Sequence, residues 1–262
     1  MAPPRLGEGA WVVTGAASGF GREFARRIAG RGASLVLFDR DADGLAETAR
    51  MLGGARVHHA TVDLLDDGAF ARAVGEARDA LGSVAHCVHC AGVLKFGRVE
   101  SMAIEDFRRM MEVNYLGTVK VAQAVLPHLR DAARGGRSLL LLTASIAGLR
   151  AAPEVGAYSA SKFAVVGLAQ ALRDELAGTG IDVRALCPPP GDTPMLRNQP
   201  SLPPIYKVTK TLSAEQIVAR ALDAVDHDHR LEMLVDAPSR ALIAASRFAP
   251  ALSEWIVRRV AG

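Results

Sequence analysis

Short apolar runs alternate with longer amphipathic segments along most of this chain, and that alternation is the feature that most restricts its fold. Six short runs indicate buried strands: Trp11–Thr14, Ser34–Phe38, Val57–Val62, Val84–His89, Ser138–Thr143 and Ile181–Leu186. Helical periodicity fills most of the intervals between them. Repeated strand–helix units predict an α/β fold with a doubly wound parallel sheet, Rossmann-type, in a three-layer α/β/α arrangement.

The order of elements predicts a single domain. The expected helices are Gly21–Gly30, Asp43–Leu52, Asp66–Leu81, Ile104–Met111, Asn114–Leu129, Gly156–Ala177 and one from Ser213 to about Val225. No linker or repeat divides residues 1–262. Seven prolines between Pro188 and Pro204 argue against a regular helix or central strand, so residues 188–212 are interpreted as a substrate loop or lid. A last strand is expected at Leu231–Val235, and residues 239–262 are expected to form a helical tail.

Composition excludes several classes of protein. The 262 residues are half hydrophobic, enough for a well-buried core, and the net charge of +3 is interspersed. No basic stripe with interleaved aromatic residues indicates nucleic-acid binding. The N-terminus lacks an apolar signal core, and no apolar run reaches the roughly 18 residues of a membrane span. We therefore expect a soluble, cytoplasmic protein.

The segment Cys87-Val88-His89-Cys90 has the spacing of a metal or redox motif. It overlaps a predicted buried strand, however, where residues i and i+3 point to opposite faces and cannot hold one ion. A structural role is favoured, and no metal site is expected. Three cysteines also do not make a disulfide framework.

A glycine-rich turn, from Thr14 to Gly21, follows the first strand and opens a helix. Its glycines permit a pyrophosphate to approach the backbone N–H groups of a helix N-terminus. Asp39 ends the second strand, where a carboxylate accepts hydrogen bonds from the ribose hydroxyls of a dinucleotide and repels a 2′-phosphate. This pattern favours NAD(H). The neighbouring Arg40 leaves NADP(H) open, and the alternative for Asp39 is an ordinary helix cap.

Tyr158 and Lys162 stand four residues apart in a predicted helix, and Ser145 lies thirteen residues upstream. Such a pair shares one helix face, about 6 Å apart along the axis. A cation near a phenol stabilises the phenolate, so we expect the pKa of Tyr158 to lie below its ordinary value of about 10. On its own the pair is a weak indication of catalysis.

Together these motifs resemble those of the short-chain dehydrogenase/reductases over roughly Trp11–Leu196. The resemblance implies a catalytic tetrad of Asn114, Ser145, Tyr158 and Lys162. The positions that it implies for cofactor contact, combined with the motifs above, are Thr14, Gly15, Ser18, Gly19, Phe20, Gly21, Asp39, Arg40, Asp63, Leu64, Ala91, Gly92, Tyr158, Lys162, Pro188 and Thr193.

Two segments depart from the family pattern. The family's Asn-Asn-Ala-Gly is His89-Cys90-Ala91-Gly92 here, which predicts the loss of the asparagine bonds that tie neighbouring strands. The family's Pro-Gly is Pro188-Pro189, which removes an N–H group and a flexible hinge.

The resemblance also implies a reaction, in which a hydride passes between nicotinamide C4 and a carbinol or carbonyl carbon. Tyr158 would transfer the matching proton, and Ser145 would hydrogen-bond the reacting oxygen. Lys162 would lower the pKa of Tyr158 and hold the nicotinamide ribose. Asn114 would hold a water that connects Lys162 to solvent.

The substrate is indicated only by the proline-rich loop. Its apolar residues Met195, Leu196, Leu202, Ile205 and Tyr206 suggest a cover for an apolar or lipid-like ketone or alcohol, although a lid that packs on its own core fits equally well. Several short segments are similar to 3-ketosphinganine reductases. That similarity would imply NADPH as the cofactor, whereas Asp39 favours NAD(H). A nucleotide-sensing protein without turnover is the non-enzymatic alternative.

The C-terminal tail combines apolar residues with Arg240, Arg247, Arg258 and Arg259. A helix pair that packs on the domain or on another subunit is one interpretation. Peripheral contact with a membrane surface is the other. The family resemblance implies a homodimer or homotetramer.

Overall fold

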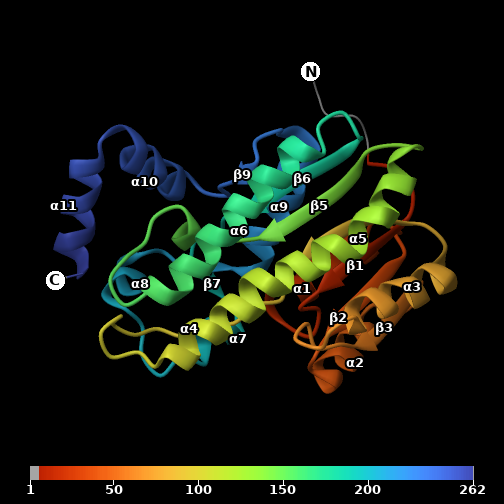
Figure 1. Cartoon of the computed structure of the whole chain (residues 1–262), viewed down its shortest axis with the longest axis horizontal. Coiled ribbons are helices and arrows are strands. Elements are labelled where there is room, and N and C mark those ends of the chain that lie inside the picture. Colours follow the sequence, from red (N-terminus) through yellow and green to blue (C-terminus); the bar gives the residue numbers. More distant parts are fainter. Residues whose placement is uncertain (1–5, 262) are drawn as a thin grey trace.

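The computed structural model describes residues 6–261, without the side chains at positions 207, 208, 256, 260 and 261. The described chain contains a seven-stranded parallel sheet in the order β3-β2-β1-β4-β5-β6-β9 (Figure 1). The strands are β1 (Ala10–Thr14), β2 (Leu35–Asp39), β3 (Val57–Thr61), β4 (Val84–His89), β5 (Ser138–Thr143), β6 (Ile181–Leu186) and β9 (Glu232–Met233). The predicted doubly wound α/β fold is confirmed.

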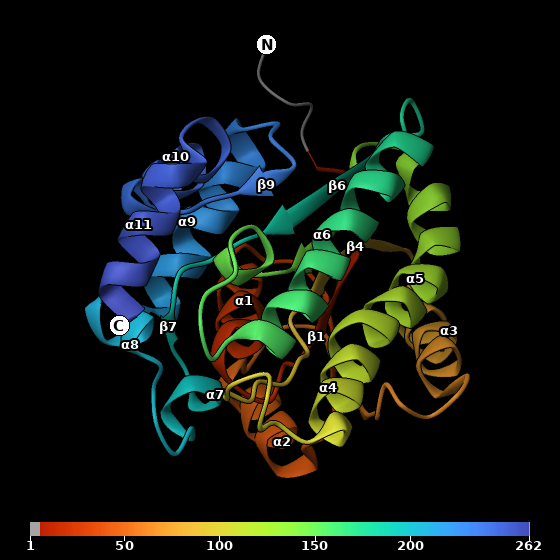
Figure 2. The same cartoon turned by 60° about the vertical axis from the view of Figure 1, so that its left-hand side comes forward.

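Helices cover both faces of this sheet (Figures 1 and 2). One face packs against α1 (Gly19–Ala29), α2 (Ala42–Met51) and α9 (Ala214–His227), and the other against α3 (Ala69–Leu81), α5 (Gly117–Ala133) and α6 (Gly156–Glu175). In β5, Leu140 and Leu142 join one core while Leu139 and Leu141 join the other. All four leucines are fully buried, as expected for a central parallel strand.

The helix expected from Asn114 begins differently. Helix α4 (Ile104–Met110) continues into a π-helical turn, Met111–Leu116, and only then into α5. Such turns are rare and occur often at functional sites, because the wider turn redirects side chains and carbonyl groups. Periodicity alone cannot show one, since the apolar pattern continues through it.

The proline-rich segment is more ordered than the sequence suggests. It contains two short helices, α7 (Pro194–Arg197) and α8 (Pro204–Val208), and a small two-stranded sheet of β7 (Gly191–Asp192) with β8 (Leu212–Ser213). The expectation of no helix there is wrong because each helix begins with its proline, where the missing N–H costs nothing. The expected last strand shortens to β9, whereas the capping box of Ser213 and Gln216 opens α9 as predicted.

The tail forms two helices, α10 (Ala237–Phe248) and α11 (Pro250–Ala261), at one end of the molecule. Helix α11 packs against α8 of the proline-rich segment. Over the described residues, none of the helices combines the length and the hydropathy needed to cross a membrane.

Candidate active site

A long groove follows the carboxyl ends of β1, β2, β3 and β4. It is lined by most of the residues predicted to contact a cofactor, namely Thr14, Gly15, Ser18, Gly19, Phe20, Gly21, Asp39, Arg40, Asp63, Leu64, Ala91, Gly92 and Thr193. The other three, Tyr158, Lys162 and Pro188, line a pocket that adjoins the groove and shares Phe20, Gly92 and Thr193 with it. The residues predicted from sequence thus surround one continuous space.

The glycine turn between β1 and α1 is too tight for other side chains. Gly15 has a φ of +67°, and a Cβ atom there would lie 2.8 Å from the backbone nitrogen of Ala91. A Cβ on Gly21 would lie 2.1 Å from the carbonyl oxygen of Gly15. The turn therefore leaves the first N–H groups of α1 open toward the groove, an arrangement that fits a pyrophosphate.

Asp39 joins the glycine turn to the end of β2. Its Oδ2 accepts a hydrogen bond from Ala17 N at 2.9 Å, and its Oδ1 accepts one from Asp41 N at 3.0 Å. The alternative that Asp39 caps the following helix is wrong, because Asp41 caps α2 by accepting from Gly44 N. Asp39 instead stands in the groove wall, where its remaining lone pairs fit ribose hydroxyls.

Arg22 also lines this part of the groove, but its guanidinium is already engaged. It donates to Thr48 Oγ1 at 2.9 Å and to Ala17 O at 2.5 Å, and it pairs with Glu47 at 2.6 Å. These bonds fix the Arg22 guanidinium on groups of the protein itself. Arg40 lines the groove as well and is exposed.

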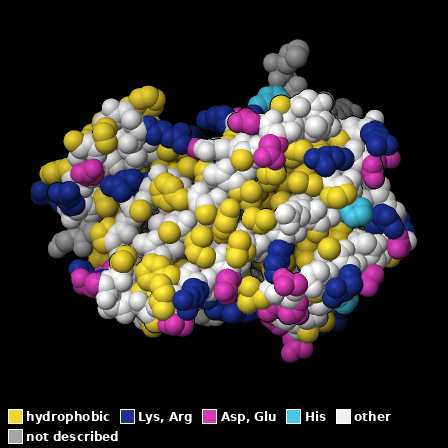
Figure 3. All heavy atoms as spheres, viewed as in Figure 1, with side chains coloured by type: hydrophobic (Ala, Val, Ile, Leu, Met, Phe, Trp, Pro, Cys, Tyr) yellow, Lys and Arg dark blue, Asp and Glu magenta, His cyan; other side chains and the backbone are white. Residues whose placement is uncertain are grey.

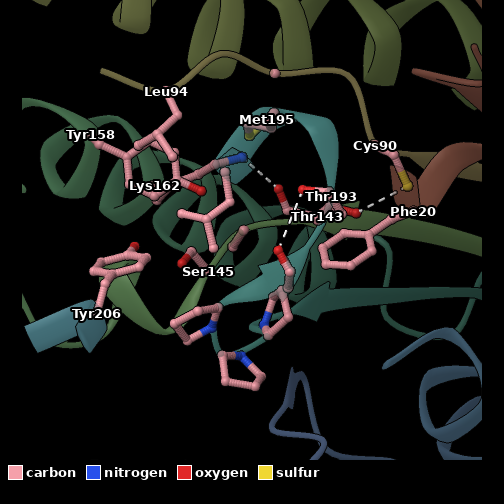
Figure 4. Close-up of a pocket in the computed structure, with 17 residues that line it drawn as sticks. Phe20, Cys90, Leu94, Thr143, Ser145, Tyr158, Lys162, Thr193, Met195 and Tyr206 are labelled. Carbon is pink, nitrogen blue, oxygen red and sulfur yellow. Dashed lines mark hydrogen bonds between the residues drawn. The ribbon is translucent and has the colours of Figure 1, made fainter. Parts of the chain in front are cut away.

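Ser145, Tyr158 and Lys162 line the adjoining pocket together (Figure 4). Ser145 follows β5, and its hydroxyl hydrogen-bonds that of Tyr158 on α6. One turn further along α6, Lys162 Nζ lies 5.8 Å from the centroid of the Tyr158 ring and donates to Thr143 O at 2.8 Å. All three side chains are buried.

Burial dominates the ionisation of this pair. It raises the pKa of Tyr158 to about 12, against the lowering effect of the Ser145 hydrogen bond. It lowers the pKa of Lys162 to about 8, with Cys90 and Cys187 acting in the opposite direction. The expectation that the pKa of Tyr158 lies below 10 is wrong in this structure, because the loss of solvation has a larger effect than the Ser145 hydrogen bond. Tyr158 is a protonated acid at neutral pH.

Asn114 lies behind the pocket in the π-helical turn and is fully buried. Its amide clamps the chain after β4: Oδ1 accepts from Val93 N at 2.7 Å, and Nδ2 donates to Val93 O and to Ser161 Oγ, both at 2.9 Å. A Cβ on Gly92 would lie within 4 Å of both Asn114 Oδ1 and Lys162 Nζ. The predicted role of Asn114 in holding a water stays a prediction.

The segment His89-Cys90-Ala91-Gly92, which departs from the family pattern, is still hydrogen-bonded to a neighbouring strand. His89 Nδ1 lies 2.7 Å from Thr14 Oγ1, so an imidazole links the ends of β4 and β1. The asparagine bonds of the family are lost as expected, and this histidine bond ties the two strand ends in their place. The interpretation of Cys87 as core is confirmed, since that side chain is fully buried, but Cys90 turns into the groove and contacts Thr143 Oγ1 at 3.4 Å.

Sequence reasoning missed several residues around the site. Thr143 supplies the carbonyl that holds Lys162, and Ser161 donates to Tyr158 O at 2.8 Å while it accepts from Asn114. Leu94 adds an apolar wall. Ser161 stands beside Lys162 in the sequence, but a serine within a helix gives no sign of which neighbour it contacts.

Three prolines, Pro188, Pro189 and Pro190, form the floor of the pocket. Two of them use their carbonyl groups: Pro188 O accepts from Ile146 N, and Pro190 O accepts from Leu212 N. The loop after β6 is therefore held rigidly at both ends where the family has a glycine hinge.

The fold and this site together define a dinucleotide-binding protein with a serine–tyrosine–lysine pocket that adjoins its groove. A family model described as short chain dehydrogenase matches residues 10–202. The chain belongs to the short-chain dehydrogenase/reductase family and is an oxidoreductase of that family.

Named relatives agree with this family. The chain is 37% identical over 221 residues to a 1-deoxy-11-beta-hydroxypentalenate dehydrogenase of Streptomyces exfoliatus, covering 83% of this chain and 79% of that protein. It is 32% identical over 239 residues to human 3-hydroxyacyl-CoA dehydrogenase type-2, covering 87% and 88%. A short-chain dehydrogenase/reductase of Burkholderia phymatum, solved in complex with NAD, superposes with a TM-score of 0.83 at 27% identity over 94% of this chain and 95% of that one.

Proposed function

We propose that this protein interconverts a secondary alcohol and a ketone with NAD(H), with Ser145, Tyr158 and Lys162 as catalytic residues and Asn114 as the residue that supports them. The observation that carries the proposal is the convergence of these three side chains on one pocket at the end of the groove. NAD(H) is supported by Asp39 in the groove wall and by the NAD in the Burkholderia structure.

The chain's own residues provide the proton chemistry. Tyr158 gives its proton to the carbonyl oxygen in reduction and takes it back in oxidation. Ser145 donates to the same oxygen and stabilises the charge that develops there. Lys162, fixed by Thr143 O, places an ammonium beside the phenol and the ribose side of the pocket. Bound nicotinamide supplies the hydride-carrying carbon.

An apolar substrate is supported by the rest of the lining. Leu94, Met195, Leu196 and Tyr206 surround the pocket. Such walls favour a compact apolar ketone or alcohol over a highly charged one.

A panel of cyclic and open-chain secondary alcohols and ketones, assayed with NAD(H) and NADP(H) at the nicotinamide absorbance, tests the proposal. The expected result is turnover of apolar members with NAD(H), and loss of at least a hundredfold in kcat for Tyr158→Phe with NADH binding retained. Unchanged turnover in Tyr158→Phe would refute the role of Tyr158.

The same panel separates the alternatives. A 3-ketosphinganine substrate reduced with NADPH in preference to NADH would favour the lipid reductase. Tight NADH binding with no turnover of any panel member by the wild-type protein would favour the nucleotide-sensing protein.

Assembly and location belong to the same proposal. Members of this family are commonly oligomeric, and Leu116 and Phe163, which are 49% and 45% exposed, offer apolar surface for a homodimer or homotetramer. Sedimentation velocity checks the oligomeric state. Cell fractionation checks the expected cytoplasmic location.

A further inference from the structure

The helix pair α10–α11 presents an apolar edge to solvent. Phe248, at the end of α10, is 89% exposed, while Leu252 and Trp255 on α11 are 52% and 56% exposed. Leu252 and Trp255 are three residues apart and share one face of α11. We call Phe248, Leu252 and Trp255 the tail edge.

Packing against the rest of the protein does not account for the tail edge. The inner side of the pair is formed by Ile243 and Val257, which are 2% and 5% exposed. Helix α11 also contacts α8 of the proline-rich segment. The interpretation that the tail is a helix pair packed on the domain is confirmed, because the inner side of the pair is buried. This packing does not explain why the apolar side chains of the outer side are exposed.

Positive charge is concentrated beside the tail edge. Residues 237–261 carry four arginines and one acidic residue, Glu254, so their net charge of +3 equals that of the whole chain. Arg259 lies 5.3 Å from the Trp255 ring, and Arg258 pairs loosely with Glu254 at 3.5 Å. Figure 3 shows basic and hydrophobic side chains close together at this end of the molecule.

We propose that the tail edge docks on an anionic lipid surface. Tryptophan and phenylalanine insert favourably at the boundary between headgroups and acyl chains, and arginines beside them extend to anionic headgroups. Each arginine near such a surface adds electrostatic attraction to the anionic headgroups. Docking needs no change in the catalytic pocket and does not depend on the proposed reaction.

A second copy of the chain suits this edge less well. A symmetric contact would bring two arginine-rich helix pairs together without matching acidic residues. The charge therefore favours an anionic lipid surface over a second copy.

Co-sedimentation of the full chain with vesicles tests the proposal. The protein is expected to pellet with mixed phosphatidylcholine and phosphatidylglycerol vesicles, far less with phosphatidylcholine alone, and less as salt increases. The double variant Phe248→Ser with Trp255→Ser should lower vesicle affinity at least tenfold. Arg258→Glu with Arg259→Glu should lower it similarly for the anionic vesicles.

Matched controls keep the result specific. Met51→Ser with Val99→Ser removes two equally exposed apolar side chains, 56% and 65% exposed, elsewhere on the surface and should leave vesicle binding unchanged. NADH binding should stay unchanged in every variant, which shows that each one folds. Wild-type protein that stays in the supernatant with both vesicle types would overturn the proposal. The proposal would also be overturned if the wild-type protein did not bind vesicles and the tail-edge double variant formed smaller particles than the wild type. That result would assign the tail edge to a subunit contact.

Discussion

The Nδ1 atom of His89, at the end of β4, lies 2.7 Å from the hydroxyl oxygen of Thr14, at the end of β1. The same oxygen accepts backbone hydrogen bonds from Cys90 N at 3.2 Å and Ala91 N at 3.3 Å. With two N–H groups donating to it, the hydroxyl directs its own proton to Nδ1 of a neutral imidazole. One threonine therefore fixes the β4 end of the cofactor groove against the glycine turn.

Thr14→Val should destabilise the protein and weaken cofactor binding. The change leaves His89 Nδ1 and Ala91 N without the hydroxyl that they bond, whereas Cys90 N keeps the carbonyl oxygen of residue 14 at 3.2 Å. Each unsatisfied buried polar group costs about 1–3 kcal/mol. We expect a loss of about 2–4 kcal/mol in the free energy of unfolding, together with weaker NADH binding, measured by urea unfolding and fluorescence titration. Thr61→Val, at an exposed position of β3, should change stability by no more than about 0.5 kcal/mol.

Two buried histidines should make stability depend on pH. Burial lowers the pKa of His86 to about 4 and that of His89 to about 3. The unfolded chain binds protons at these residues near pH 6.5, whereas the folded protein does not, so stability falls as pH decreases below 6.5. From pH 7 to pH 5 we expect a loss of about 3 kcal/mol in the free energy of unfolding.

Urea unfolding at pH 7, 6 and 5 measures this loss. His89→Asn should remove about half of the pH dependence, while His59→Asn, at an exposed position, should leave it intact. Equal unfolding free energies at pH 7 and pH 5 would contradict the assignment.

The sheet was predictable because its signals are local. Runs such as Ser138–Thr143 show their burial in composition alone, and the observed strand has the predicted bounds. The groove residues were predictable for a related reason: the carboxyl ends of parallel strands meet at one edge, so motifs after successive strands come together. The π-helical turn at Asn114 and the bond from His89 to Thr14 were not predictable, since each depends on a backbone or side-chain geometry set by tertiary packing. The pKa of Tyr158 was misjudged because spacing shows a charged neighbour but not the depth of burial.

Asp39→Asn should shift cofactor choice toward NADP(H). A carboxylate at this position would repel a 2′-phosphate and bond ribose hydroxyls. The amide removes the charge and keeps one of the two oxygen acceptors that Ala17 N and Asp41 N use. Since hydrogen bonds to charged groups are worth about 1.5–3 kcal/mol, the ratio of kcat/KM for NADPH over NADH should rise about 10- to 100-fold. Asp43→Asn removes a charge from the same groove without touching the glycine turn and should shift the ratio little. An unchanged ratio in Asp39→Asn would exclude Asp39 as the discriminating residue.

Ser161→Ala should slow turnover by loosening Asn114. The serine hydroxyl is one of two acceptors for Asn114 Nδ2, and without it the amide is held only by its two hydrogen bonds to Val93. We expect kcat to fall about tenfold, which corresponds to 1.4 kcal/mol, with NADH affinity nearly unchanged. Ser161→Thr, which keeps the hydroxyl, should recover most of the rate. Ser159→Ala is the matched control on the same helix, because the buried Ser159 hydroxyl has no hydrogen-bond partner in the described residues.

Tyr206→Ala should widen the pocket on its α8 side. The Tyr206 ring packs against Phe96 with centroids 4.9 Å apart and belongs to the apolar cluster that contains Tyr158. Without the ring, KM for compact apolar ketones should rise about tenfold, because the substrate loses the contact of a large aromatic side chain. The kcat/KM of bulkier ketones should increase relative to that of compact ones.

The conservative change separates packing from hydrogen bonding. Tyr206→Phe keeps the ring and should leave KM within about twofold if packing alone defines this wall. NADH affinity should be the same in both variants, since Tyr206 lines the reactive pocket but not the cofactor groove. If Tyr206→Ala left the order of preference among ketones of different size unchanged, α8 would not form part of the substrate pocket, and the proline-rich segment would pack on its own core instead.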